Sequence, residues 1–250
     1  MTCCNVEPDE LHVVHLGTSA LLLGSCLWLL VYERLPHTPQ ANVEQIWAEL
    51  CEGYVKHRSG TQFSPLTLSS FCDPDKPHRE FPKLRGRGAE VKDLVLPLVD
   101  CWRRHRRNTD DDALLLDVLY AQADMQSILS DHADEPFLPL EVARRFEKCC
   151  WKMVQGTTVL ALSAQRQKKL LFNVVPKHHW AIHMGLRSHW VNPRKANTMI
   201  DEDFVKHIKH IVVSSAHGTA PHDIPSKVVE KYRIGIWLLV QHGLRLNRKG

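Results

Sequence analysis

The sequence predicts an all-α protein of about eight helices. After residue 42, apolar residues recur almost continuously at the spacing of one helix face, while the alternation typical of strands is nearly absent. Capping residues and prolines mark where several of these helices begin. Apolar residues make up 44% of the chain and charged residues 24%, the balance of a globular protein that buries a real core.

The first predicted helix is strongly apolar. No Asp, Glu, Lys or Arg occurs from His12 to Tyr32, and acidic residues precede this run, where a secretory signal carries lysine or arginine. Because the apolar part from Ala20 to Tyr32 is shorter than the roughly 20 residues that span a bilayer, we expect a buried core helix. A membrane-associated protein anchored by residues 13–32 is the alternative.

The chain is expected to divide into N-terminal helices over residues 1–60, an irregular connector over 61–88 and a helical domain over 89–250. Asn42 is expected to cap a helix that runs to about His57. Residues 61–88 contain four prolines and two glycines, which favour an irregular path.

The predicted helical domain begins with a helix over residues 89–107 that Pro97 is expected to kink. Thr109 is expected to cap the next helix, because three aspartates follow it, where negative charge meets the positive end of the helix dipole. The longest predicted helix covers residues 140–171. Gly156 weakens the middle of that helix and favours two helices that meet at an angle.

The segment that begins at Pro176 holds the densest set of reactive side chains in the chain. Proline suits the first turn of a helix, and a helix from this point places His179 and His183 one turn apart on one face. A basic turn that contains Pro193 ends this helix. The next helix is expected to start at Asp201, whose carboxylate can accept the free N–H groups of the first turn.

Two side-chain pairs have the spacing of metal ligands. Asp9 and His12 lie one helical turn apart, so both can converge on a metal, or the aspartate can orient the imidazole. A helix cap with a solvent-facing histidine explains the same spacing. His179 and His183 have the spacing of a zinc pair, but the segment lacks the glutamate of H-E-x-x-H, which excludes that type of metalloprotease. This pair has two interpretations. One is a metal-stabilised helical interaction module, and the other is a histidine-rich helix face packed on aromatic side chains.

Asp201-Glu202-Asp203 places three carboxylates at a helix start. Magnesium binds such oxygens, but it takes them from two or three separate segments of a chain. An acidic first turn that the helix dipole favours is the alternative interpretation.

Basic residues gather in short segments that the net charge of +4 conceals. Such segments can line a surface that binds nucleic-acid phosphates, although solvated helix ends explain them as well, because the dipole favours basic side chains at helix C-termini. We expect weak contacts to the phosphate backbone of DNA. The candidate nucleic-acid-binding residues are Arg103, Arg104, Arg106, Arg107, Arg166, Lys168, Lys169 and Arg194.

The eight cysteines show neither C-x-x-C spacing nor the density of a small disulfide scaffold. We therefore expect reduced thiols in an intracellular compartment.

Three short motifs occur in order along the chain. The first is Asp-x-x-His followed by Leu-Gly and an apolar helix, the second is a basic, glycine-containing helix start followed by Leu-Pro, and the third joins a histidine helix, an Asn-Pro turn and an acidic helix start. Their residues are Asp9, His12 and Leu16-Gly17; Leu84-Arg85-Gly86-Arg87-Gly88-Ala89-Glu90 with Leu96-Pro97; and Pro176-Lys177-His178-His179 to His183, Asn192-Pro193 and Asp201-Glu202-Asp203-Phe204. Taken in order, these motifs resemble the C-terminal part of the transposases of CACTA-like (En/Spm-type) cut-and-paste DNA transposons and of their host-domesticated or decayed relatives.

The resemblance implies an RNase-H-like transposase whose catalytic carboxylates hold Mg²⁺, with a large helical insertion before the final glutamate. Glu202 stands in the place of that glutamate, and Asp9 and His12 are the other catalytic candidates, with Asp9 as a further metal ligand. His178 stands where the family has an aromatic residue. No strands that carry the family's earlier aspartates precede Asp9, so we expect a nuclear, DNA-associated chain that is catalytically incomplete alone. Such a chain would act with a missing N-terminal catalytic segment or through self-association.

Overall fold

The computed structural model describes residues 8–247, without the side chains of residues 199–207, 239 and 242–247. The described residues form helices and irregular connections and contain no β-strand, which confirms the predicted all-α class. The chain divides into two compact units, the first ending at Asn197 and the second beginning at Thr198. The predicted boundaries at residues 60 and 88 both fall inside the first unit.

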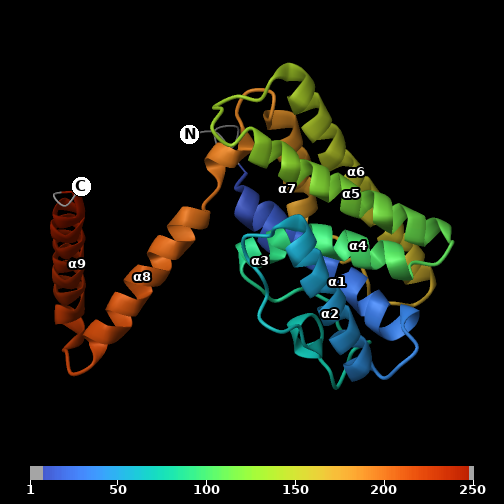
Figure 1. Ribbon diagram of the computed structural model, residues 1–250, viewed down its shortest axis with the longest axis horizontal. Helices are drawn as coiled ribbons and strands as arrows, with labels where there is room; N and C mark the ends of the chain where they lie inside the picture. Colours follow the sequence, from blue (N-terminus) through green and yellow to red (C-terminus); the bar gives the residue numbers. More distant parts are fainter. Residues whose placement is uncertain (1–7, 248–250) are drawn as a thin grey trace. The chain divides into compact units, whose positions relative to one another are not determined.

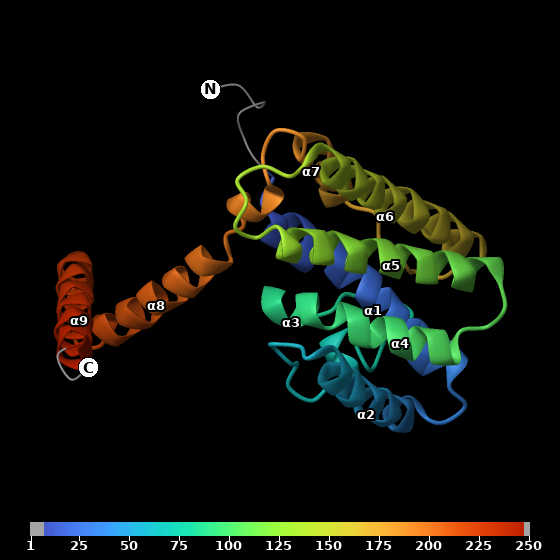
Figure 2. The same cartoon turned by 45° about the horizontal axis from the view of Figure 1, so that its top comes forward.

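One central helix, Leu11–Arg34, organises the first unit. It consists of η2 (Leu11–Ser19), α1 (Ala20–Leu29) and η3 (Leu30–Arg34), with π-helical turns at both ends. It is long and apolar enough to cross a membrane, yet 94% of its most apolar window is buried within the chain itself. Every residue of α1 is buried, as expected for a helix that is apolar on all sides. Figures 1 and 2 show other helices of this unit packed around it.

Helix α2 (Pro39–His57) begins earlier than predicted. Thr38, rather than Asn42, is the N-cap, and its hydroxyl accepts a hydrogen bond from the backbone N–H of Ala41 at 3.4 Å. The expected Asn42 cap is therefore wrong. The Asn42 side chain is buried instead, and its amide donates to the carbonyl oxygens of Val31 at 2.7 Å and Leu35 at 3.2 Å. It thereby ties the end of the central helix to α2.

The connector that follows α2 is irregular, as predicted, and contains only the short η4 (Leu68–Ser70). Most of its apolar side chains, including Phe63 and Phe71, are buried in the core, whereas Phe81 is exposed. The backbone N–H of Leu84 donates to the carbonyl oxygen of Ala20 at 2.8 Å. The connector crosses the central helix so closely at Gly24 that a Cβ there would lie 2.8 Å from the Leu84 nitrogen.

Helices α3 (Gly88–Asp93), α4 (Val95–His105) and α5 (Asp110–Asp131) follow in order. Leu94 separates α3 from α4, so the interruption of the predicted helix falls ahead of Pro97. Thr109 is the N-cap of α5, as predicted, and its hydroxyl accepts from the N–H of Asp112 at 3.2 Å.

Helix α6 (Leu140–Arg166) is continuous, so the predicted division at Gly156 is wrong. A Cβ at Gly156 would lie 2.3 Å from a methyl carbon of Val118 in α5. The glycine therefore allows α5 and α6 to approach closely, and the packing between them offsets its low helix propensity.

The first unit ends with α7 (Pro176–Arg187), which starts at the predicted proline, and with η5 (Pro193–Ala196). The second unit contains α8 (Met199–Ala216), η6 (Pro221–Asp223) and α9 (Ile224–Asn247), and α8 packs against α9. Helix α8 begins ahead of the predicted start at Asp201. The backbone of Glu202 lies in this helix, whereas its side chain lies outside the described residues.

Candidate nucleic-acid interface

Two basic segments that lie far apart in the sequence meet at one end of the first unit. Figures 1 and 2 show that α4 and α6 end there and that α5 begins there. Glu33 of the central helix bridges the two segments. Arg107 Nη2 donates to the Glu33 carbonyl oxygen at 2.5 Å, and Lys169 Nζ lies 2.6 Å from Glu33 Oε1. The fold thus joins the two arginine- and lysine-rich segments into one surface.

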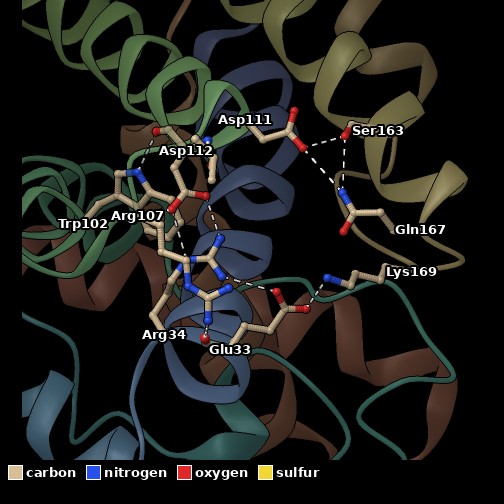
Figure 3. A network of polar contacts seen from close by, with 10 residues as sticks. Glu33, Arg34, Trp102, Arg107, Asp111, Asp112, Ser163, Gln167 and Lys169 are labelled. Carbon is tan, nitrogen blue, oxygen red and sulfur yellow. Dashed lines mark hydrogen bonds and ion pairs between the residues drawn. The ribbon is translucent and has the colours of Figure 1, made fainter.

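A buried carboxylate, Asp112, holds the loop between α4 and α5 (Figure 3). Arg34 donates to it twice, with Nη2–Oδ1 at 2.6 Å and Nε–Oδ2 at 3.1 Å. The backbone N–H of Arg107 donates to Asp112 Oδ2 at 2.7 Å, and Trp102 Nε1–H donates to the Asp112 carbonyl oxygen at 3.1 Å. The end of α4 and the loop after it, which together carry the arginine run, are therefore fixed from both sides.

The neighbouring Asp111 holds the C-terminal end of α6 (Figure 3). Ser163 Oγ donates to Asp111 Oδ2 at 2.5 Å, and Gln167 Nε2 lies 3.5 Å from the same oxygen. The chain then turns out of α6 at Lys168, whose φ is 57°. Consecutive aspartates at the start of α5 thus anchor both basic segments, each through a different side chain.

Some basic side chains where α4 and α6 end are free to contact a ligand, and others already contact acidic residues of the chain. Arg103, Arg106, Arg166 and Lys168 are exposed and form no salt bridge with another described side chain. Arg104 instead pairs with Glu49, with Nη1–Oε2 at 3.0 Å, and Arg107 and Lys169 contact Glu33. Half of the predicted nucleic-acid-binding residues are therefore available to bind phosphate. They are Arg103, Arg106, Arg166 and Lys168.

Arg194 does not belong to this surface. Its Nη1 atom lies 3.5 Å from Oε2 of Glu10. Glu10 is next to the N-terminal end of the central helix, whereas the basic segments meet at its C-terminal end. Glu10 is buried and also contacts His15 Nε2 at 2.9 Å and Asn197 Nδ2 at 2.6 Å. Burial acts to raise the pKa of Glu10, but these hydrogen bonds and the charges of His15 and Arg194 outweigh it, so the pKa lies below its usual value.

The structure brings the predicted Asp9 and His12 side chains into contact through Asp9 Oδ2 and His12 Nδ1. Asp9 also caps the central helix, because its carboxylate accepts from the N–H groups of Leu11 at 3.1 Å and His12 at 3.3 Å. The helix-cap interpretation and the aspartate–histidine pairing are therefore both realised. The third predicted catalytic residue, Glu202, has its side chain outside the described residues.

The first parts of the three motifs, at Asp9, Leu84–Glu90 and Pro176–His183, meet around the first half of the central helix, whereas Asp201–Phe204 of the third motif belong to the second unit. Helices α3 and α7 both pack on η2. A Cβ at Gly17 would lie 2.7 Å from the Cδ atom of Lys177. Burial and the nearby charge of Lys83 lower the pKa of Lys177, while Asp9 acts in the opposite direction. Segments that lie far apart in the sequence thus supply neighbouring acidic and basic groups here.

His179 and His183 of α7 are also neighbours, with their Nε2 atoms 2.8 Å apart. Trp180 packs beside them, its ring centroid 5.7 Å from that of His183. No described histidine, cysteine, aspartate or glutamate completes a group of three potential ligands with this pair. The predicted pairing is present, and the aromatic packing of the alternative interpretation is present with it.

Sequence patterns did not single out a different group of potential metal ligands, formed by Glu49, Cys101 and His105. The available signal was the spacing of Cys101 and His105, which places both side chains on one face of α4. Glu49 comes from α2, and only the packing of α2 on α4 brings it to them.

Comparisons with known proteins found no matching family model, no matching curated protein and no matching solved structure.

Proposed function

We propose that this chain is a transposon-derived protein that associates with nucleic acid through the end of the first unit where α4 and α6 finish. The observation that carries the proposal is the convergence of Arg103, Arg106, Arg166 and Lys168. Guanidinium and ammonium groups that lack an acidic partner bind phosphate oxygens without first breaking an internal ion pair.

The proposed contact is with the phosphate backbone and carries no sequence preference. Asp110 and Asp111 lie at the same end and limit the positive potential, which favours weak binding. Four phosphate contacts on duplex DNA correspond to a slope of log affinity against log salt of roughly −3.6. Most of the binding free energy should therefore disappear at high salt.

The transposase part of the proposal rests on the resemblance of the three motifs, and the meeting of their first parts around η2 supports it. Motifs that form one functional module are expected to lie together in the fold, and Asp9, Leu84 and Lys177 do so. The proposed role of this chain is that of a helical part that positions DNA, while further catalytic carboxylates are supplied from outside residues 8–247 or by another chain.

The test is fluorescence anisotropy of a labelled duplex over a series of salt concentrations. The variant replaces Arg103, Arg106, Arg166 and Lys168 together with alanine. The control variant removes the same charge from exposed residues elsewhere in the first unit, namely Arg58, Lys76, Arg79 and Lys148. We expect the first variant to lose most of the affinity and most of the salt slope, and the control to keep both. Equal losses in the two variants, or binding that ignores salt, would overturn the proposal.

A further inference from the structure

Glu49, Cys101 and His105 form a compact group at the interface between α2 and α4. The ligand atoms of all three lie within 4.8 Å of one another. His105 Nε2 lies 2.8 Å from Glu49 Oε1 and 2.9 Å from Oε2, and Cys101 Sγ lies 3.5 Å from Oε2. The part of the chain that the structure describes contains no other such group of three.

The local packing explains why the group is compact. Cys101 and His105 lie one turn apart on α4 and face α2. Gly53 of α2 lies so close to α4 that a Cβ there would be 2.8 Å from the Cα atom of Pro97. This close approach of the two helices brings the Glu49 carboxylate against the thiol and the imidazole.

We propose that Glu49, Cys101 and His105 bind a zinc ion that links α2 to α4. A thiolate, an imidazole and a carboxylate together form a donor set that zinc accepts, whereas magnesium prefers oxygen ligands alone. We therefore do not expect the proposed site to hold the Mg²⁺ ions that phosphoryl transfer needs.

The observed distances are close to those around a tetrahedral zinc ion. Zinc–sulfur and zinc–oxygen bonds of normal length place the sulfur and the oxygen roughly 3.6 Å apart, and Cys101 Sγ lies 3.5 Å from Glu49 Oε2. The corresponding nitrogen–oxygen separation is about 3.4 Å, so the His105 ring must withdraw from Glu49 by about half an ångström. A small side-chain movement of this kind needs no change in the helices.

Neighbouring side chains keep the Glu49 carboxylate ionised. Gln45 Nε2 donates to Glu49 Oε1 at 3.1 Å, and Arg104 Nη1 lies 3.0 Å from Oε2. Burial acts to raise the pKa of Glu49, but the hydrogen bonds from His105 and Gln45 outweigh it, so the pKa lies below its usual value and the carboxylate is charged. The Arg104 side chain is half exposed and can turn toward solvent when a cation enters.

The thiol is protonated before the metal binds. Burial, together with the charge of Glu49, raises the pKa of Cys101 well above its usual value. Binding forms a zinc–sulfur bond, breaks the S–H bond and releases the proton to water, with no change in oxidation state. Affinity should therefore rise with pH. The fourth position is open to a groove lined by Glu52 and Lys56, where water completes the coordination.

The test uses the full chain freed of metal by a chelator and titrated with Co²⁺ as a spectroscopic probe. We expect one ion per chain and a thiolate-to-cobalt charge-transfer band, which zinc then removes by displacement. Cys101→Ser should abolish the band, and His105→Gln, at a partly exposed position, should weaken binding by more than about tenfold. The controls are Cys149→Ser and His183→Ala, which should keep both the band and the affinity.

Zinc should also raise the thermal unfolding midpoint of the wild-type chain but not that of either site variant, because the ion binds only the folded site. Circular dichroism establishes that each variant is folded before titration. The proposal is overturned if the wild-type chain shows no thiolate band, if folded Cys101→Ser keeps it, or if folded His105→Gln binds as tightly as wild type. Loss of the band in Cys149→Ser instead would place the metal elsewhere.

Discussion

Arg34 and Asp112 form a two-point ion pair in which both side chains are almost fully removed from solvent. The exposed fractions are 7% for Arg34 and 3% for Asp112, and the two hydrogen bonds measure 2.6 and 3.1 Å. The guanidinium carbon of Arg34 also lies 5.5 Å from the centroid of the Trp102 ring. This pair connects the end of the central helix to the start of α5, beside the loop that carries Arg106 and Arg107, so the fold and the proposed interface depend on the same contact.

Replacing Asp112 with asparagine is expected to destabilise the first unit strongly. The change keeps the volume but leaves buried Arg34 with only the longer contact to Glu33, at 3.3 Å, and breaking a buried ion pair costs about 3–5 kcal/mol. Urea unfolding followed by circular dichroism measures the loss. Asp117→Asn is the control, because Asp117 is exposed and pairs loosely with Lys152 at 3.6 Å, so its removal should cost less than about 1 kcal/mol. Equal losses in the two variants would contradict the organising role of Asp112.

Gly24→Ala is expected to destabilise the chain, although alanine is the better helix former. The added methyl group would lie 2.8 Å from the Cα atom of Lys83 and from the Leu84 nitrogen, and backbone atoms cannot swing away as side chains do. Overpacking of this kind costs about 1–3 kcal/mol.

Gly60→Ala provides the control for this glycine, because its new methyl group meets only Asp93 Oδ2 at 3.7 Å. That change should stay within about 0.5 kcal/mol of wild type in the same urea experiment. A Gly24→Ala chain as stable as wild type would show that the connector does not press on the central helix.

Local signals in the sequence predicted many of the helix boundaries. Thr109, followed by three aspartates, and Pro176 each marked a start correctly, because a cap or a fixed φ acts within one turn. The predicted cap at Asn42 and the predicted helix division at Gly156 were wrong because these two residues do not act locally. Their roles depend on partners in other elements, the carbonyl groups at the end of the central helix for Asn42 and Val118 for Gly156. Propensity describes a residue within its own helix and not what packs against it.

In the candidate nucleic-acid interface, too, local features could be predicted from the sequence and contacts between distant segments could not. The basic segments were visible in the sequence because each is a local run, and both lie at solvent-exposed helix ends. Their convergence depends on Glu33, Asp111 and Asp112, whose contacts reach across 52 residues or more. Glu49 likewise joins Cys101 and His105 only through helix packing. Periodicity within one helix cannot indicate such distant pairings.

Stability is expected to fall on the acid side partly through Glu10. The folded pKa of this carboxyl lies below its ordinary value of 4.5, so its contribution is fully present above that value and is lost as the pH falls through the lower, folded value. In Glu10→Gln, stability at neutral pH should decrease by roughly 1–3 kcal/mol, because Arg194 and Asn197 lose a charged partner. The decline below pH 4.5 should then be shallower than in wild type.

The measurement for this change is urea unfolding at a series of pH values from neutral to acid. Glu80→Gln is the control, because Glu80 is exposed, and this variant should reproduce the wild-type curve. A Glu10→Gln chain with the wild-type acid slope would show that other carboxyl groups, such as Asp100, account for the dependence.

The last prediction is that the isolated chain neither cuts nor joins DNA. In-line phosphoryl displacement by two metal ions needs carboxylates from at least two convergent segments, which stabilise both the attacking and the leaving oxygen. Asp9 caps a helix and contacts His12, which leaves it poorly disposed to be the main ligand of a hard cation. Under the proposed relationship Glu202 stands in the place of the final catalytic glutamate, and a lone carboxylate holds magnesium weakly.

The assay incubates purified chain with supercoiled plasmid and Mg²⁺ or Mn²⁺, beside Glu202→Gln and Asp9→Asn variants. We expect no metal-dependent nicking by any of the three proteins. Nicking by wild type that persists in both variants would indicate a contaminating nuclease, because neither candidate carboxylate would contribute to it. Nicking that wild type shows and Glu202→Gln loses would demonstrate a complete metal site in this chain, and the expectation of catalytic incompleteness would then be wrong.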